Sequence, residues 1–359
     1  MRILPDRRAK LRAAMRAAGV DIAALTPGPT LRYLSERGWQ TGDRPLLALF
    51  PLAGEPALVC PALMGESPRF AYSDAESPQP ALEHALESLA ARNRAIGVEA
   101  NRLRYAEARL ISQCAPDSHL LDFSAELADL RMIKDAGEIA AIRHAIAMSE
   151  AALRDTLASA RIGISERELA ARLDSRMIEL GADGLAFETL LHAGANTALP
   201  HTAPLAYRIQ PGDPLLIDFG ARAAGYCADI TRTVFVGAVT AAQRDFYAVV
   251  EAANAAARAV ARPGVSAETV DVAARQVIIA AGYGDLIRHR TGHGIGLQAH
   301  EAPYIVRGNQ QRLQAGMVFT IEPGIYRMGE IGVRIEDDIL ITETGAESLT
   351  TFPRGAMVV

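Results

Sequence analysis

The sequence predicts an α/β (α+β) protein with two domains, the second of which is built from two related halves. Three observations support this prediction. The chain has 359 residues, half of them hydrophobic, which is enough for two domains. Short apolar runs alternate with proline and glycine up to about residue 121, whereas a strongly helical pattern begins near residue 125. Within that second part, two segments recur at nearly constant spacing.

The first domain is predicted to span residues 1–124. Its opening stretch, MRILPDRRAKLRAAMRAAGV, contains an amphipathic helix with Leu11, Met15 and Ala18 on one face, and it lacks the apolar core of a signal peptide. Brief apolar strands follow in DIAALTPGPT and LLALFPLAGEPALVCP, and one clear helix is expected near residues 80–92. This alternation is typical of a separate α/β domain.

The second domain is predicted to span residues 125–359 and to open with a long helix. Asp135 and Glu138 have the spacing of an N-cap residue and its capping partner. Apolar side chains then recur at helical spacing, at Ile139, Ile142, Ile146 and Leu153.

The second domain repeats itself. The segment ARIGISERELAARLDSRMIELGA starts at Ala160, and ARPGVSAETVDVAARQVIIAAGY starts 101 residues later at Ala261. The segment RIQPGDPLLIDFG starts at Arg208 and aligns with RLQAGMVFTIEPG, 104 residues later at Arg312. Each half therefore has a glycine turn, a serine N-cap, an apolar helix and a hairpin, and the two halves are expected to be related by a pseudo-twofold axis.

Each predicted hairpin carries two acids at corresponding positions. The alignment places Asp218 on Glu322, and Asp229 in ADITRT corresponds to Glu336 in VRIEDD. A pseudo-twofold axis would bring these four carboxylates together inside the domain. Burying an isolated carboxylate costs roughly several kcal/mol in lost hydration. Four carboxylates in one place therefore predict a bound cation.

The composition argues against several classes of partner. A net charge of −5 and a pI near 5.9 give no basic surface for nucleic acid or an anionic membrane. No segment reaches the roughly 20 apolar residues of a membrane span. Three cysteines, Cys60, Cys114 and Cys227, are widely spaced, which favours a reducing compartment, and we expect a cytoplasmic protein.

A histidine completes the set of candidate metal ligands. His293 lies in HRTGHGIGLQAHE between the two hairpins, where neighbouring glycines let the backbone approach an ion. One imidazole and four carboxylates, without a thiolate, suit Mn, Co, Fe or Zn. They are too many for one catalytic zinc and suit two metals with shared carboxylates. Such a pair activates water and polarises a carbonyl group, which indicates hydrolysis of an acyl bond.

Other polar residues are candidates for supporting roles. His201 and His300 lie 99 residues apart, close to the duplication offset, so we expect them to face each other across the metals. One would stabilise the oxyanion, and the other would contact the substrate or the leaving nitrogen. Arg334 lies two residues before Glu336 and could hold that carboxylate or contact substrate. His192 has no evident duplicated partner and is interpreted as structural.

Four motifs carry a family resemblance: IDFGARAAGYCADITRT, HRTGHGIGLQAHEAP, TIEPGIY and GVRIEDDILIT. From about residue 125 to the end, the chain resembles the pita-bread metallopeptidases, in particular the Xaa-Pro branch of prolidases and aminopeptidases P. The segment LRMIKDAGEIAAIRHA is similar to the interdomain helix of that family, and the first 120 residues resemble its creatinase-type N-terminal domain.

The resemblance implies specific roles. Asp229 and Glu336 would bridge two divalent ions, Asp218 would complete one site, and His293 with Glu322 would complete the other. Glu322 would also shuttle a proton, and the remaining matches to supporting catalytic positions are His201, His300 and Arg334. The metal expected from the family is Mn²⁺, with Co²⁺ or Zn²⁺ as alternatives, and the expected assembly is a homodimer.

The expected substrate is a small peptide with proline second. The leading prediction is a prolidase-type Xaa-Pro dipeptidase, and the alternative is an aminopeptidase P that acts on longer peptides. Some short prolidases have an arginine after the HExP motif, where this chain has Tyr304. We therefore predict that Arg44, or else Arg37, binds the dipeptide carboxylate.

Two further functions are known for proteins that resemble this fold. Methionine aminopeptidase shares the metal ligands but lacks an N-terminal domain of this kind. A non-catalytic binding protein would have lost the ligands, whereas all five motif positions are filled here.

Overall fold

The computed structural model describes residues 3–40, 42–64 and 69–359. Contacts divide the chain into two compact units, Met1–Arg131 and Met132–Val359. Helix α5 (Ser124–Met132) falls almost entirely in the first unit, and α6 (Ala136–Ser159) belongs to the second. The break between these helices is set at Asp135, whose side chain accepts a hydrogen bond from the Glu138 amide in a capping box, as predicted.

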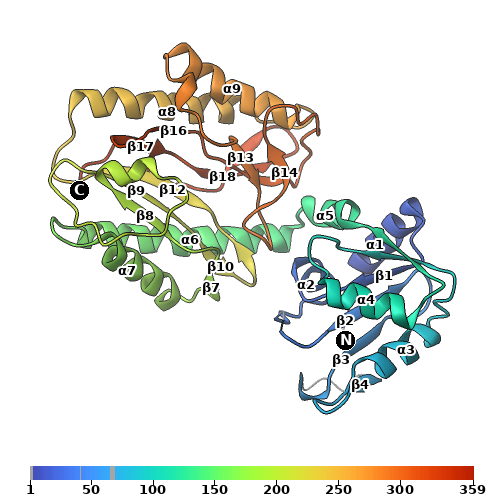
Figure 1. Ribbon diagram of the computed structural model, residues 1–359. Coiled ribbons are helices and arrows are strands. Elements are labelled where there is room, and N and C mark those ends of the chain that lie inside the picture. Colours follow the sequence, from blue (N-terminus) through green and yellow to red (C-terminus); the bar gives the residue numbers. More distant parts are fainter. Residues whose placement is uncertain (1–2, 41, 65–68) are drawn as a thin grey trace. The chain divides into compact units, whose positions relative to one another are not determined.

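The first unit is a six-stranded mixed sheet with helices (Figure 1). Its strand order is β4-β3-β2-β1-β5-β6, with β1–β5, β5–β6 and β3–β4 parallel. The strands are β1 Ile22–Leu25, β2 Leu47–Pro51, β3 Ala57–Pro61, β4 Phe70–Tyr72, β5 Ala95–Val98 and β6 His119–Asp122. The helices are α1 Pro5–Ala18, α2 Pro29–Ser35, α3 Gln79–Ser88 and α4 Tyr105–Cys114, together with α5.

Two details of this unit differ from the sequence expectation. The helix predicted near residues 80–92 ends at Ser88, because the chain leaves helical geometry and Ala90 and Asn93 take positive φ. Helices α2 and α4 were not predicted, because seven and ten residues give few repeats of the helical period. In α1, Leu11 and Met15 are buried as expected.

The second unit places strands between two helical layers. In Figure 1, α6 and α7 lie on one side of the strands and α8 and α9 lie on the other. The remaining helices are α7 Glu166–Glu179, α8 Ala241–Val260 and α9 Ala267–Ala280. The strands of the first half are β7 Gly184–Leu185, β8 Leu190–Ala193, β9 Pro214–Phe219, β10 Ala221–Ala223, β11 Tyr226–Cys227 and β12 Ile230–Phe235. Those of the second half are β13 Gly292–Gly294, β14 Glu301–Ile305, β15 Val318–Ile321, β16 Gly324–Arg327, β17 Ile331–Arg334, β18 Asp337–Ile341 and β19 Ala346–Ser348.

The predicted duplication is visible in backbone detail. Ser165 caps α7 and forms an isolated bridge with Arg208, and Ser266 caps α9 and forms the same bridge with Arg312. Each arginine also donates from Nη1 to a glycine carbonyl, at 2.7 Å for Arg208 and 2.8 Å for Arg312. The two halves therefore share their turn geometry as well as their element order.

Each half also has its own hydrophobic core. One cluster packs α6 and α7 against β8, β9 and β12, with Leu173 and Ile217 fully buried. The other packs α8 and α9 against β15, β17 and β18, with Val250 and Phe319 fully buried. The strands that supply these clusters also position the four acids, which belong to neither cluster.

No helix within the described ranges is both long and apolar enough to cross a membrane. Over the same ranges, the three cysteines form no disulfide.

Candidate metal centre

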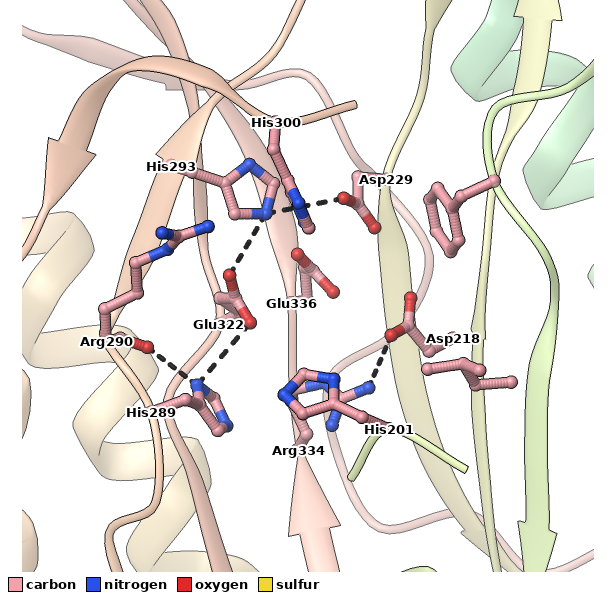
Figure 2. A pocket seen from close by; sticks show the side chains of 12 residues that line it. His201, Asp218, Asp229, His289, Arg290, His293, His300, Glu322, Arg334 and Glu336 are labelled. Carbon is pink, nitrogen blue, oxygen red and sulfur yellow. Dashed lines mark hydrogen bonds and ion pairs between the residues drawn. The ribbon is translucent and has the colours of Figure 1, made fainter. Parts of the chain in front are cut away.

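A cavity of about 420 Å³ lies between the two halves of the second unit. It is lined by every candidate site residue of the second domain, namely His201, Asp218, Asp229, His293, His300, Glu322, Arg334 and Glu336. Four more residues complete the lining: Phe187, Leu190, His289 and Arg290. Figure 2 shows the acids in the middle of the group, with histidines around them.

Strand pairing places the four acids. Asp218 lies in β9 opposite Thr231 of β12, so it is close to Asp229, which directly precedes β12. In the second half, Glu322 follows β15 and Glu336 precedes β18. The amide of Glu336 donates to the Thr231 carbonyl at 3.1 Å, which joins the two halves at the acids.

The ligand atoms fall into two groups of three that share one residue. Asp218, Asp229 and Glu336 form one group. His293, Glu322 and Glu336 form the other. Within each group the atoms lie within 4.8 Å of one another. A third combination joins Asp229 and His293 to His300, so His300 is also within reach of a bound ion.

His293 is oriented toward the cavity through Nε2. Its Nδ1 lies 3.1 Å from the Gly294 carbonyl, which can only accept, so Nδ1 carries the proton. Nε2 lies 3.2 Å from Glu322 Oε1, to which it donates a hydrogen bond when protonated, and 3.6 Å from Asp229 Oδ2. Because Nδ1 is held by the Gly294 carbonyl, Nε2 is the nitrogen that can lose its proton and bind a metal.

The electrostatics of the acids call for a cation. Burial and then the charge of Glu336 raise the pKa of Asp229 well above its usual range, and burial and then Glu322 do the same for Glu336. Burial would also raise the pKa of Glu322, but the hydrogen bond from His293 and nearby positive charges lower it to about 2. Asp218 Oδ1 is buried and has no hydrogen-bond partner among the described residues. The residues therefore fit divalent ions.

Arg334 binds Asp218. Its Nη2 lies 2.5 Å from Asp218 Oδ2, while Nε donates to Thr231 Oγ1 at 3.1 Å and Nη1 to Tyr326 Oη at 2.7 Å. Glu336 instead accepts from Thr231 Oγ1 at 2.5 Å. Arg334 therefore forms its ion pair with Asp218, which belongs to the other half of the unit, and not with Glu336.

The neighbouring histidines are held as neutral rings. His289 was not predicted, although it lies only four residues before His293. Its Nδ1 donates to the Arg290 carbonyl at 2.7 Å, so its Nε2 accepts from Tyr326 Oη at 2.7 Å. The ring of His300 packs edge-on against His293, with ring centroids 4.0 Å apart. Burial, followed by the charges of His293 and Arg290, lowers the pKa of His300 to about 4.

His192 requires a correction. His192 of β8 pairs with Leu216 of β9. In the second half, Gly294 of β13 pairs with Phe319 of β15, so the preceding residue, His293, lies at the position equivalent to His192. The offset of 101 residues between Ser165 and Ser266 also maps His192 onto His293, so His192 has a duplicated partner, contrary to the expectation from sequence. His192 is buried and does not line the cavity, and burial lowers its pKa.

Arg44 belongs to the first unit. Its Nη2 lies 2.7 Å from Asp74 Oδ2 in an exposed ion pair. Its role toward a substrate stays a prediction, as does that of Arg37.

Comparison with known proteins decides the family. The model of metallopeptidase family M24 matches residues 140–343, and that of the creatinase/prolidase N-terminal domain matches residues 7–133. The chain belongs to metallopeptidase family M24. The pita-bread fold of the catalytic part and the creatinase-type N-terminal domain, both expected from the resemblance, are confirmed.

Relatives that match nearly the whole of this M24 chain include Xaa-Pro peptidases. It is 34% identical over 351 residues to a Xaa-Pro dipeptidase of Lactobacillus helveticus, covering 95% of each chain. The crystal structure of a prolidase from Thermococcus sibiricus matches with a TM-score of 0.94 at 32% identity, covering 100% of each chain. An X-Pro aminopeptidase from Thermotoga maritima matches with a TM-score of 0.88 at 32% identity, covering 98% of this chain and 99% of that one.

Proposed function

We propose that this chain is a two-metal exopeptidase that hydrolyses the bond before proline in Xaa-Pro dipeptides. The observation that carries the proposal is a cavity of about 420 Å³ in which two three-residue ligand groups share Glu336. That volume suits a small peptide. The proline specificity is supported by the relatives, among which are a Xaa-Pro dipeptidase and a prolidase.

Asp218, Asp229 and Glu336 would hold one ion, and His293 with Glu322 would hold the other, with Asp229 and Glu336 shared. Bound divalent ions would polarise the scissile carbonyl and lower the pKa of the attacking water. We propose Mn²⁺ because the ligand set is oxygen-rich and has no thiolate. Co²⁺ and Zn²⁺ are the alternatives that a metal series would compare.

The protein side chains would move the protons. Glu322 would accept one proton from the attacking water and pass it to the proline nitrogen as the C–N bond breaks, releasing the amino acid and proline. One of His201 and His300 would donate a hydrogen bond to the developing oxyanion, and the other would contact the substrate or the leaving nitrogen. Arg334 would keep Asp218 in its orientation through their 2.5 Å contact.

The test is hydrolysis of alanyl-proline by the purified, Mn²⁺-loaded protein, compared with alanyl-prolyl-alanine and alanyl-alanine. We expect cleavage of alanyl-proline, slower cleavage of the tripeptide and none of alanyl-alanine. Loss of activity on chelation and its return with Mn²⁺ would support the metal requirement. A protein that cleaves none of these peptides with Mn²⁺, Co²⁺ or Zn²⁺ would favour the non-catalytic alternative.

An aminopeptidase P is the second candidate. It is favoured by Tyr304, which stands where some short prolidases have an arginine, and by the similarity to an X-Pro aminopeptidase. Faster cleavage of the tripeptide than of the dipeptide in the same assay would support it.

We further propose a cytoplasmic homodimer. The widely spaced cysteines support the reducing compartment, and the family resemblance supports the dimer. Light scattering coupled to gel filtration measures the assembly, and a mass of one chain would contradict it.

A further inference from the structure

The cavity contains a positive charge that no described carboxylate neutralises. Two arginines line it, Arg290 and Arg334. Arg334 is bound to Asp218. Among the described residues, the guanidinium of Arg290 forms no ion pair or hydrogen bond, and its one described partner is the ring of Tyr304, 4.7 Å from the guanidinium carbon.

The strand register explains why that ring is available. In the β13–β14 pair, His293 lies opposite Tyr304, and Arg290 lies two residues before Gly292, the first paired residue of β13. An aromatic face attracts a guanidinium but leaves its N–H edge able to donate elsewhere. Tyr304 therefore positions Arg290 without consuming its hydrogen-bond donors.

The position of Arg290 relative to the acids suits a substrate with charges at both ends. Figure 2 draws Arg290 on the side of the cavity that holds His289 and His293, away from Asp218 and His201. A free dipeptide carries an ammonium group on its first residue and a carboxylate on its second. A guanidinium binds a carboxylate through two parallel N–H donors, whereas a peptide amide offers it only a neutral carbonyl.

We propose that Arg290, supported by Tyr304, binds the free C-terminal carboxylate of the dipeptide and so makes the enzyme a dipeptidase. This inference rests on the proposed Xaa-Pro peptidase function. Tyr304, which stands where some short prolidases have an arginine, then acts by holding Arg290, which lies fourteen residues earlier in the chain. The sequence suggests the same role for Arg44, so the two arginines are tested together.

The experiment compares alanyl-proline with alanyl-prolinamide, which lacks the carboxylate, in the Mn²⁺-loaded wild type and in Arg290→Gln. We expect the wild type to prefer alanyl-proline and Arg290→Gln to lose about 10- to 100-fold in kcat/KM for it, mainly through KM. Hydrolysis of alanyl-prolinamide should be unchanged. Arg290→Lys should restore part of the preference, because it keeps the charge and loses the planar fork.

Arg327→Gln is the matched control. Arg327 also stacks on aromatic rings, those of Phe246 and Tyr283, but it does not line the cavity. Its preference for alanyl-proline should equal that of the wild type. An equal loss on both substrates in Arg290→Gln would overturn the proposal, and so would loss of the preference in Arg44→Gln but not in Arg290→Gln.

Failure of the proposed function would be distinct. If the wild type cleaves no Xaa-Pro substrate, calorimetric titration with proline and with prolinamide still measures carboxylate binding. We expect proline to bind the metal-loaded wild type about tenfold more tightly than prolinamide, and this difference to vanish in Arg290→Gln. Equal affinities of the wild type for the two ligands would contradict the assignment of Arg290.

Discussion

Asp218 has two oxygens in different situations. Oδ2 lies 2.5 Å from the guanidinium of Arg334, whereas Oδ1 is buried without a hydrogen-bond partner among the described residues. An unpartnered buried carboxylate oxygen costs on the order of 1–3 kcal/mol. A bound cation would remove this cost, so metal binding and the burial of Asp218 depend on each other.

Asp218→Ala should remove one metal ion per chain and abolish turnover, because only Asp229 and Glu336 would remain in that ligand group. The fold should persist, since Asp218 lies at the cavity and not in either hydrophobic core. Elemental analysis should find one ion per chain instead of two, and circular dichroism should be unchanged.

Asp245→Ala is the control for this variant, because Asp245 is an exposed acid of α8. It should retain both ions and full activity. A full metal content in Asp218→Ala would show that its carboxylate is not a ligand.

At the scale of elements, a buried ion pair connects the start of the second unit with the strand after His300. Lys134 Nζ lies 2.7 Å from Glu301 Oε1, with the two side chains 1% and 4% exposed. The pair leaves no room beside it: a Cβ on Gly296 would lie 2.6 Å from Glu301 Oε1 and 3.0 Å from Lys134 Cε. This contact fixes the first residue of β14, directly after His300.

Lys134→Met should lower the free energy of unfolding by about 3–5 kcal/mol, because it removes the ammonium that neutralises a buried carboxylate. The double variant Lys134→Met/Glu301→Leu should recover part of the loss, since apolar side chains then replace both charges. Urea unfolding followed by fluorescence or circular dichroism measures these differences.

The exposed pair of Arg143 and Glu347 provides the comparison, with Nη2 and Oε2 2.7 Å apart and side chains about half exposed. Arg143→Met should cost less than about 1 kcal/mol. Similar losses in Arg143→Met and Lys134→Met would mean that burial of the Lys134 pair has no energetic consequence.

At the scale of the whole molecule, the two units have separate cores. The first is built around its sheet, with Leu47 and Ile96 fully buried, and the second has the two clusters on either side of the metal centre. Bound ions would stabilise only the unit that holds the ligands, by about 2.7 kcal/mol at a free metal concentration a hundred times Kd.

Chelation of the metals should therefore raise amide hydrogen exchange in β9, β12, β15 and β18 and leave β1 and β5 unchanged. Mass spectrometry of the full chain with and without chelator measures this. An equal increase in β1 and β5 would contradict the expected independence of the first unit.

The fold and much of the site could be predicted because their signals are local. Asp218 and Glu322 each end an apolar strand, and the repeated segments around them are visible in sequence. The correspondence of His192 and His293 was also available from the offset but was missed. The contribution of Arg290 could not be predicted, because it depends on the β13–β14 register that sets Tyr304 opposite His293 and brings its ring to Arg290.

The duplication has a consequence for the direction in which a peptide binds. A dimer of identical halves would present the same groups at both ends of its cavity and could not distinguish the amino end of a substrate from its carboxyl end. Joined in one chain, the halves have diverged. With the offset of 101 residues, the counterpart of Arg290 in the first half is Thr189, which is buried and donates a hydrogen bond to Asp174. The symmetry between the halves thus brings the four acids together. Differences at single positions, such as Arg290 in one half and Thr189 in the other, make the two ends of the cavity chemically distinct, as an exopeptidase requires.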